Sequence, residues 1–366
     1  MEKIIVEIKN ENKKYPVFIG NSLLPKIADF IKEKHNDKKV IVITDDIVKS
    51  LYENKILDAL KQSKPCLISV PAGEESKSRE TKQYIEDILL ERMYGRDTII
   101  IAFGGGVVGD LAGFIASTFK RGIPLIHLPT TLLAMVDSSI GGKTGINTKH
   151  GKNLIGTIYQ PEAVFTDINF LNELPDNEFL SGLAEIIKMA ATLDEKLFDF
   201  METNYKKILS REKDILINLI KRSIELKKEI VGKDPFESGP RQVFNFGHTL
   251  GHAIESASKL AIKHGFCISI GMAVESRVAV LSGNLASEEE KRITALLESF
   301  RLPTKIKKDI KSSRLIEFMK EDKKARKQKP RFVILKKIGR IKQDENNFSF
   351  EIDESTIKKA IEASRE

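Results

Sequence analysis

The chain has 366 residues, of which 41% are hydrophobic and 31% charged, and its formal net charge is +8. That length exceeds what one hydrophobic core usually holds, so two domains are expected. The composition is that of a soluble globular protein, and neither a signal-peptide core nor an apolar stretch of membrane-spanning length is apparent. The two cysteines, Cys66 and Cys267, form no CxxC pattern and favour a reducing cytoplasm.

The basic excess lies late in the chain, in residues 305–308 and 323–329. No aromatic residues are interleaved there at base-stacking spacing, and the chain has no tryptophan. A nucleic-acid partner is therefore not expected. A solvated basic face accounts for such runs, and a basic pocket for a phosphorylated small molecule would use the same charges.

The first half of the chain alternates short apolar runs with amphipathic stretches. Residues 1–6 alternate like an edge strand, and residues 80–92 have a helical pattern. Buried parallel strands are predicted at residues 40–43, 66–70, 98–103 and 125–128. This alternation predicts an α/β domain with a Rossmann-like, open parallel sheet over residues 1–175.

From about Asp176 the pattern becomes helical, and no convincing buried strand interrupts it. Periodic apolar and charged positions cover residues 178–191, 211–231, 249–260, 268–282 and 287–300. Residues 176–366 are therefore predicted to form a second, mainly α-helical domain.

A glycine-rich loop follows the strand that ends at Phe103. Gly104, Gly106 and Gly109 fit G-x-G-x-x-G at a strand-to-helix turn, where the backbone can approach a pyrophosphate. A dinucleotide site usually has an acid roughly 20 residues further on, but residues 124–131 contain none. By topology, Asp45 at the end of the 40–43 strand is the candidate for holding the ribose.

A second glycine-rich run, GGKTG at residues 141–145, imitates a P-loop. The match fails, because the position of the first Walker glycine holds Asp137. A lysine among glycines, Lys143, still suggests an oxyanion or phosphate site. Lys152 and Asn153 add a further cation and an amide.

Three of the six histidines, His248, His252 and His264, fall in one short stretch. Residues four apart share a helix face, so His248 and His252 can enter the same site, and imidazole is a common zinc ligand. Thr249 stands where a zinc protease has its glutamate base, which excludes that class. From these residues alone, ordinary helix-face hydrogen bonding remains the alternative.

Taken together, these motifs resemble the 3-dehydroquinate synthase family of sugar-phosphate cyclases. The matching segments are residues 71–78, 104–114, 121–147, 151–161, 181–188 and 245–255, with a weaker echo at 321–324. The resemblance implies an N-terminal NAD-binding α/β domain, a C-terminal helical domain that binds metal and substrate, and a catalytic cleft between them. It also implies a homodimer.

The resemblance further implies a role for individual residues. One divalent metal ion, zinc or cobalt, would be held by Glu185, His248 and His264, so that His252 would face the substrate. NAD would contact Asp45, Glu74, Lys77, Gly105, Gly106, Val107, Asp110, Thr130, Thr131, Lys143 and Lys152. The substrate would be surrounded by Asp137, Lys143, Asn153, Lys188, Lys227, Arg241, Asn245, His252 and Lys324 (or its neighbour Lys323). Arg121 would reach into the neighbouring subunit's site.

The implied enzyme is a carbon–oxygen lyase of the shikimate pathway, which leads to the aromatic amino acids. It converts 3-deoxy-D-arabino-heptulosonate 7-phosphate to 3-dehydroquinate and phosphate. The steps are transient oxidation by NAD, phosphate elimination, re-reduction and intramolecular aldol closure. Another sugar-phosphate cyclase, or a polyol dehydrogenase of the same fold, is the alternative.

Two positions depart from the family pattern. Phe266 stands where the family usually has a glutamate two residues after the histidine at 264, which could alter hydrogen bonding around the metal. Pro240 precedes Arg241 and restricts Gly239.

Overall fold

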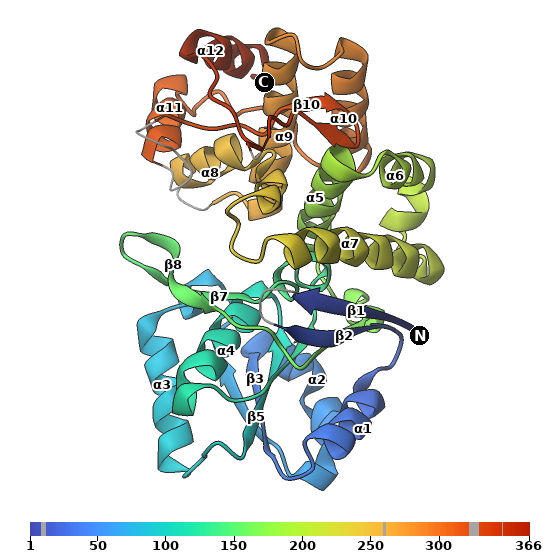
Figure 1. The fold of residues 1–366 in the computed structure, drawn as a ribbon, viewed down its shortest axis with the longest axis vertical. Coiled ribbons are helices and arrows are strands. Elements are labelled where there is room, and N and C mark those ends of the chain that lie inside the picture. The colour runs from blue at the N-terminus through green and yellow to red at the C-terminus, as the bar shows by residue number, and fades with distance from the viewer. Residues whose placement is uncertain (9–11, 259–260, 322–328, 346) are drawn as a thin grey trace. The chain divides into compact units, whose positions relative to one another are not determined.

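The computed structural model describes residues 1–8, 12–258, 261–321, 329–345 and 347–366. Lys323 and Lys324, expected at the substrate, lie outside the described residues. The chain forms two compact units (Figure 1), residues 1–174 with 227–235 and residues 175–226 with 236–366. The assignment of NAD to residues 1–175, and of metal and substrate to residues 176–366, remains a proposal.

A seven-stranded sheet with the order β1-β2-β9-β6-β5-β3-β4 forms the centre of the first unit (Figure 1). Its strands are β1 (Glu2–Ile8), β2 (Lys13–Gly20), β3 (Lys39–Asp45), β4 (Cys66–Val70), β5 (Thr98–Gly104), β6 (Leu125–Pro129) and β9 (Ala163–Asp167). All neighbours pair in parallel except β1, which is antiparallel to β2 at the edge. The predicted edge strand at the N-terminus, the four predicted parallel strands (β3, β4, β5 and β6) and the Rossmann-like class are confirmed, although β4 lies at the opposite edge of the sheet and is only partly buried.

Helices α1 (Leu24–Lys34), α2 (Asp46–Ala59), α3 (Arg79–Glu91) and α4 (Gly106–Thr118) connect the strands. Ile85 and Leu89 of α3 and Leu111 of α4 pack in one apolar cluster with the side chains of β3 and β5. β5 is buried along its whole length, which explains why its sequence is a continuous apolar run and not an alternating one. The predicted helix at residues 80–92 is confirmed as α3.

The GGKTG segment leads into an antiparallel hairpin of β7 (Lys143–Thr148) and β8 (Gly151–Ile158). This hairpin was not predicted, because its glycines were interpreted as a loop. A Cβ at Gly156 would lie 1.9 Å from the carbonyl oxygen of Thr144. Glycine at this position therefore permits the close approach of the two strands.

The second unit is mainly helical, as predicted. Its helices are α5 (Asp176–Leu193), α6 (Glu195–Leu209), α7 (Lys213–Lys233), α8 (His248–Ala257), α9 (His264–Leu281), α10 (Ser287–Ser299), α11 (Ser312–Glu321) and α12 (Glu354–Ala363). The last part of α7, from Lys227, packs with the first unit. Three of these helices, α6, α11 and α12, were not predicted, nor was the short hairpin of β10 (Leu335–Lys337) and β11 (Arg340–Ile341).

Helix α9 corrects one expectation. Its 18 residues have a mean hydropathy of 1.3, so by length and composition it could cross a membrane, although no such stretch was predicted. Because 72% of this helix is buried, we interpret it as a core helix of the second unit. Its apolar character comes from packing on all sides.

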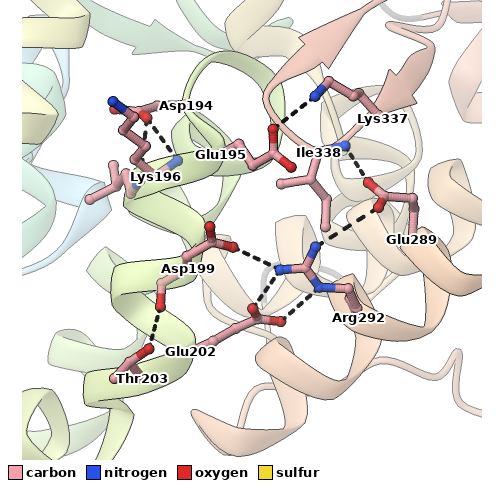
Figure 2. Close-up of polar contacts among 11 residues, drawn as sticks. Asp194, Glu195, Lys196, Asp199, Glu202, Thr203, Glu289, Arg292, Lys337 and Ile338 are labelled. Atoms are coloured by element: carbon pink, nitrogen blue, oxygen red, sulfur yellow. Dashed lines mark hydrogen bonds and ion pairs between the residues drawn. The ribbon is translucent and has the colours of Figure 1, made fainter.

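Arg292 of α10 connects three parts of the second unit (Figure 2). Its Nη2 donates to Asp199 Oδ1 at 2.8 Å and to Glu202 Oε2 at 2.6 Å, both on α6. Its Nη1 lies 3.8 Å from Glu289 Oε1, and Glu289 also accepts from the Ile338 N–H in the β10–β11 turn. A charge network of this kind holds α6 and the small hairpin against α10.

The buried His127 on β6 gives the fold a pH dependence. Burial lowers the pKa of His127 to about 4, against about 6.5 in an unfolded chain. Below pH 6.5, His127 is therefore protonated in the unfolded chain but remains neutral in the folded chain. The free energy of unfolding consequently decreases as the pH falls towards 4. The loss by pH 4 is on the order of 3 kcal/mol.

Urea unfolding of wild type and His127→Gln, followed by circular dichroism at pH 7 and pH 4, isolates this contribution. We expect the wild type to lose more stability than the variant over this interval, by roughly 3 kcal/mol. An equal loss in both proteins would show that His127 is not responsible.

Candidate active site

Three side chains from different helices meet in the second unit: Glu185 of α5, His248 of α8 and His264 of α9. Glu185 Oε1 lies 3.7 Å from His248 Nε2 and 3.6 Å from His264 Nε2. One ligand atom from each residue falls within 4.8 Å of the others. A carboxylate and two imidazoles are a donor set that zinc uses in catalytic sites, where a fourth position stays open. The residues present therefore fit a divalent ion.

The ring of His248 is oriented by its own chain. Its Nδ1 donates to the carbonyl oxygen of Phe246 at 3.1 Å, since a carbonyl can only accept. Nε2, which lies toward Glu185, is then the nitrogen that can act as a metal ligand. A hydrogen bond on the other ring nitrogen is how metal-binding histidines are usually held.

A second carboxyl group, Glu255 of α8, lies 3.4 Å from His264 Nδ1 through its Oε2. Burial lowers the pKa of His264, but the hydrogen bonds and charges of Glu185 and Glu255 outweigh burial and raise it to about 9. No role for Glu255 was predicted from the sequence. It supplies His264 with a carboxylate partner.

His252 belongs to a second possible donor group, with Glu255 and His264. Its ring centroid is 5.2 Å from that of His248 and 6.0 Å from that of His264. The structure therefore brings all three histidines together, and two overlapping sets of donors share His264. The first set contains the more deeply buried carboxylate, Glu185, which is 1% exposed.

Three of the cationic and amide groups expected at the substrate, Lys188, Arg241 and Asn245, lie in the same unit. Lys188, one turn from Glu185 on α5, forms an ion pair with it and lies 5.6 Å from the centre of the Phe244 ring. Lys188 and Arg241 are both buried. Asn245 Nδ2 donates to Glu237 Oε1 at 2.8 Å. No role for Glu237 was predicted from the sequence. Buried cations of this kind suit an anionic ligand, because ionic groups are stable out of water only with partners.

In the first unit, the residues expected at NAD follow neighbouring parallel strands. Asp45 ends β3, the glycine loop follows β5, and Thr130 and Thr131 follow β6. Carboxyl ends of parallel strands form the usual ligand edge of such sheets. Asp45 Oδ1 accepts from the Val48 N–H at 2.8 Å, and burial raises the pKa of Asp45 against that bond.

The glycine loop forms the start of α4. Gly105 is the N-cap, and Gly106 and Val107 begin the helix, where backbone N–H groups have no partner within the helix. A Cβ at Gly105 would lie 3.1 Å from Thr131 Cγ2, and one at Gly106 would lie 3.2 Å from Ser138 Oγ. The loop therefore offers bare backbone at a helix N-terminus, which suits a pyrophosphate.

Lys77 joins three segments of the first unit. Its Nζ donates at 2.5 Å both to Asp110 Oδ2 on α4 and to Asn153 Oδ1 on β8. Burial raises the pKa of Asp110, and the Lys77 ammonium opposes that rise. Glu74 Oε1 accepts from Asn147 Nδ2 at 2.7 Å in the same region. Residues expected at NAD (Lys77, Asp110) and at the substrate (Asn153) thus form one cluster.

The remaining expected residues are placed less closely together. Lys227 on α7 forms an ion pair with Asp137, within the first unit. Lys143 is exposed at the start of β7, and Lys152 lies on β8. Arg121 lies beyond the far end of α4 from the glycine loop, about 20 Å along the helix. Its own chain therefore does not bring Arg121 to the nucleotide edge of the sheet.

Comparison with known proteins shows the family to which the chain belongs. The model of the 3-dehydroquinate synthase N-terminal region matches residues 67–181, and that of the C-terminal region matches residues 182–325. The 3-dehydroquinate synthase of Thermodesulfovibrio yellowstonii is 41% identical over 364 residues, which cover 99% of each chain.

Two solved structures with the same fold carry ligands. A 2-deoxy-scyllo-inosose synthase, complexed with carbaglucose-6-phosphate, NAD+ and Co2+, superposes with a TM-score of 0.91 at 25% identity, covering 99% of this chain and 100% of its own. A 2-epi-5-epi-valiolone synthase from Streptomyces hygroscopicus, with NAD+ and Zn2+ bound, gives a TM-score of 0.84 at 26% identity, covering 95% and 96%.

His264→Ala should abolish tight binding of Zn2+ or Co2+, because only one carboxylate and one imidazole of the first donor set would remain. NAD should bind as to wild type, since the expected nucleotide residues lie in the other unit. Metal content after dialysis and a fluorescence titration with NADH measure the two effects separately. Normal metal content in the variant would contradict the ligand assignment.

Proposed function

Because the chain belongs to the 3-dehydroquinate synthase family, we propose that it converts 3-deoxy-D-arabino-heptulosonate 7-phosphate to 3-dehydroquinate and phosphate. The observation that carries the proposal is the group of Glu185, His248 and His264 with the buried Lys188 on the same helix as Glu185. It combines donors for a divalent ion with a cation for an anionic substrate. In the shikimate pathway this reaction serves aromatic amino-acid biosynthesis.

The proposed cofactors are NAD and one divalent ion, zinc or cobalt, as in the two cyclase structures. When bound, NAD would take up and return a hydride, and the ion would polarise the substrate hydroxyl that is oxidised. The overall reaction breaks a carbon–oxygen bond and releases phosphate without net oxidation. The enzyme is therefore proposed to be a carbon–oxygen lyase.

The chain's own residues would bind and orient an anionic sugar phosphate. Arg241 suits a carboxylate or phosphate, since guanidinium can donate two parallel hydrogen bonds. Burial of Arg241 and Lys188 keeps water from competing for these contacts. We propose that the other substrate-facing residues are Asp137, Lys143, Asn153, Lys227, Asn245 and His252.

For the nucleotide, the proposal rests on the edge of the parallel sheet. The glycine loop would receive the pyrophosphate at the start of α4. Asp45 would bind the ribose. The remaining proposed contacts are Glu74, Lys77, Asp110, Thr130, Thr131, Lys143 and Lys152.

We also propose a cytoplasmic homodimer. Both cysteines are free, which suits a reducing compartment. Arg121 lies in a turn where Lys120 and Arg121 have positive φ angles of 50° and 68°, a conformation that is uncommon for non-glycine residues. A role in the neighbouring subunit's site would explain why its own chain holds Arg121 far from the glycine loop.

A sibling cyclase is the alternative function, since both solved cyclases share the fold. Identity to them is 25% and 26%, against 41% to the synthase relative. The proposed reaction is therefore the one that the comparisons favour. A polyol dehydrogenase would differ in performing net oxidation.

The reaction itself is tested with the heptulosonate phosphate, NAD and Zn2+, by measuring released phosphate together with absorbance of NADH. We expect phosphate in proportion to substrate consumed, no accumulating NADH, and loss of turnover on treatment with a chelator. Accumulating NADH would indicate a dehydrogenase. Phosphate released only from another sugar phosphate would indicate a sibling cyclase.

The role of Arg121 is tested by mixing two inactive proteins, Arg121→Ala and His264→Ala, after subunit exchange. If Arg121 serves the partner's site, one site of each mixed dimer has neither defect, so activity should return. Mixing either variant with itself is the control. A mixture that remains inactive, although mixed dimers are present, would contradict the proposed role.

A further inference from the structure

The three helices that carry the candidate metal ligands are connected by two buried hydrogen-bonding side chains, and neither is itself a ligand. They are Glu275 of α9 and Ser181 of α5. Glu275 is 0% exposed, and Ser181 is also buried. A buried carboxyl group on a mostly apolar helix is costly unless its hydrogen bonds are satisfied. The two N–H groups that Glu275 accepts from indicate what it does.

Glu275 closes the start of α8. Its Oε2 accepts from the Gly247 N–H at 2.8 Å, and its Oε1 accepts from the Leu250 N–H at 3.1 Å. Gly247 is the N-cap, His248 the first residue and Leu250 the third residue of α8. These are the two N–H groups that the side chains of a capping box satisfy within one helix. Here a single carboxyl group from another helix satisfies both.

The local backbone explains why the cap comes from α9. Gly247 has a φ of +75° and no side chain, and a Cβ there would lie 2.6 Å from Met272 Cγ. A Cβ at Gly271 would lie 1.9 Å from the carbonyl oxygen of Gly247. The two helices thus approach each other closely at Gly247 and Gly271. The two bonds to Glu275 add a directional constraint on their register at this point.

Ser181 makes the corresponding connection between α5 and α9. Its Oγ accepts from the N–H of Gly265, next to His264, at 3.1 Å. Ser181 precedes Glu185 by one helical turn, so the two lie on the same face of α5. The register of α9 against α5 sets the separation of His264 and Glu185, and the register of α8 against α9 sets that of His248 and His264.

We propose that Glu275 and Ser181 are positioning residues that set the spacing of the three metal ligands, with Glu275 contributing more. The inference rests on the metal site of the proposed function. It goes beyond that function because it assigns the geometry of the site to two residues that touch neither metal nor substrate.

The test is Glu275→Gln, titrated with Co2+ in the absence of substrate. Glutamine keeps the shape but has one oxygen, so its amide NH2 would face a backbone N–H that loses its acceptor. We expect the affinity for Co2+ to fall about 10- to 100-fold, and the visible absorption bands of bound Co2+ to change in position or intensity. Ser181→Ala should act in the same direction, with a smaller loss.

Glu290→Gln is the matched control. Glu290 is a buried carboxyl group of the same unit, on α10, and its partner is Arg277. It should show an ordinary loss of stability with wild-type Co2+ affinity and spectrum. Circular dichroism and thermal unfolding of the metal-free proteins show that each variant is folded at the titration temperature.

Wild-type affinity and spectrum in Glu275→Gln would overturn the inference. If that variant does not fold, Ser181→Ala decides by the same two readouts. Failure of the wild type to bind Co2+ would overturn this inference together with the proposed metal site. Normal Co2+ binding by a wild type that does not turn over the heptulosonate phosphate would overturn only the proposed reaction.

Discussion

The buried carboxylate of Glu185 is the contact on which the candidate active site depends. It faces His248 and His264 through one oxygen and Lys188 through the other. Lys188 is a cation that pairs with this carboxylate, whereas His248, which donates from Nδ1, presents its other ring nitrogen, Nε2, to Glu185 as a possible metal ligand. A carboxylate so deeply buried is stable only with a partner of opposite charge or a metal ion. The same carboxylate thereby brings the site for a metal ion next to a cation suited to phosphate or carboxylate.

The first unit follows a different principle, in which topology and not a buried charge assembles the site. Parallel strands β3, β5 and β6 end at one edge of the sheet, so Asp45, the glycine loop and Thr130 come together although they are far apart in sequence. Lys77 then ties α4 to the β7–β8 hairpin through Asp110 and Asn153. A nucleotide could bind to the backbone N–H groups at this edge of the sheet. The bonds from Lys77 to Asp110 and Asn153 hold the hairpin in place.

Much of the fold was predictable from local pattern. Short, partly β-branched apolar runs identified β3, β4, β5 and β6, and a periodicity of 3.6 residues identified α5 and α7 to α10. The β7–β8 hairpin was missed because its sequence is rich in glycine, as that of a phosphate-binding loop is. In the hairpin these glycines allow the two strands to approach closely. Helix α6 was missed because only Asp194 separates it from α5, so the sequence offers no loop between them.

The candidate metal ligands were predicted from sequence motifs. The residues that form hydrogen bonds to these ligands or to their helices were not predicted. Glu255 and Glu275 act on residues that helix packing brings to them, His264 and the start of α8, and no sequence spacing reveals those contacts. A signal did exist for Glu275. It is an acidic residue within a nearly continuous apolar helix, and such a residue is retained when its bonds are specific.

A crystal structure of the zinc-loaded protein would show whether Glu185, His248 and His264 hold the metal ion. Anomalous scattering measured on both sides of the zinc absorption edge would locate the ion. We expect a single peak bound by these three side chains. A peak bound instead by His252, Glu255 and His264, the second set of donors, would contradict this assignment.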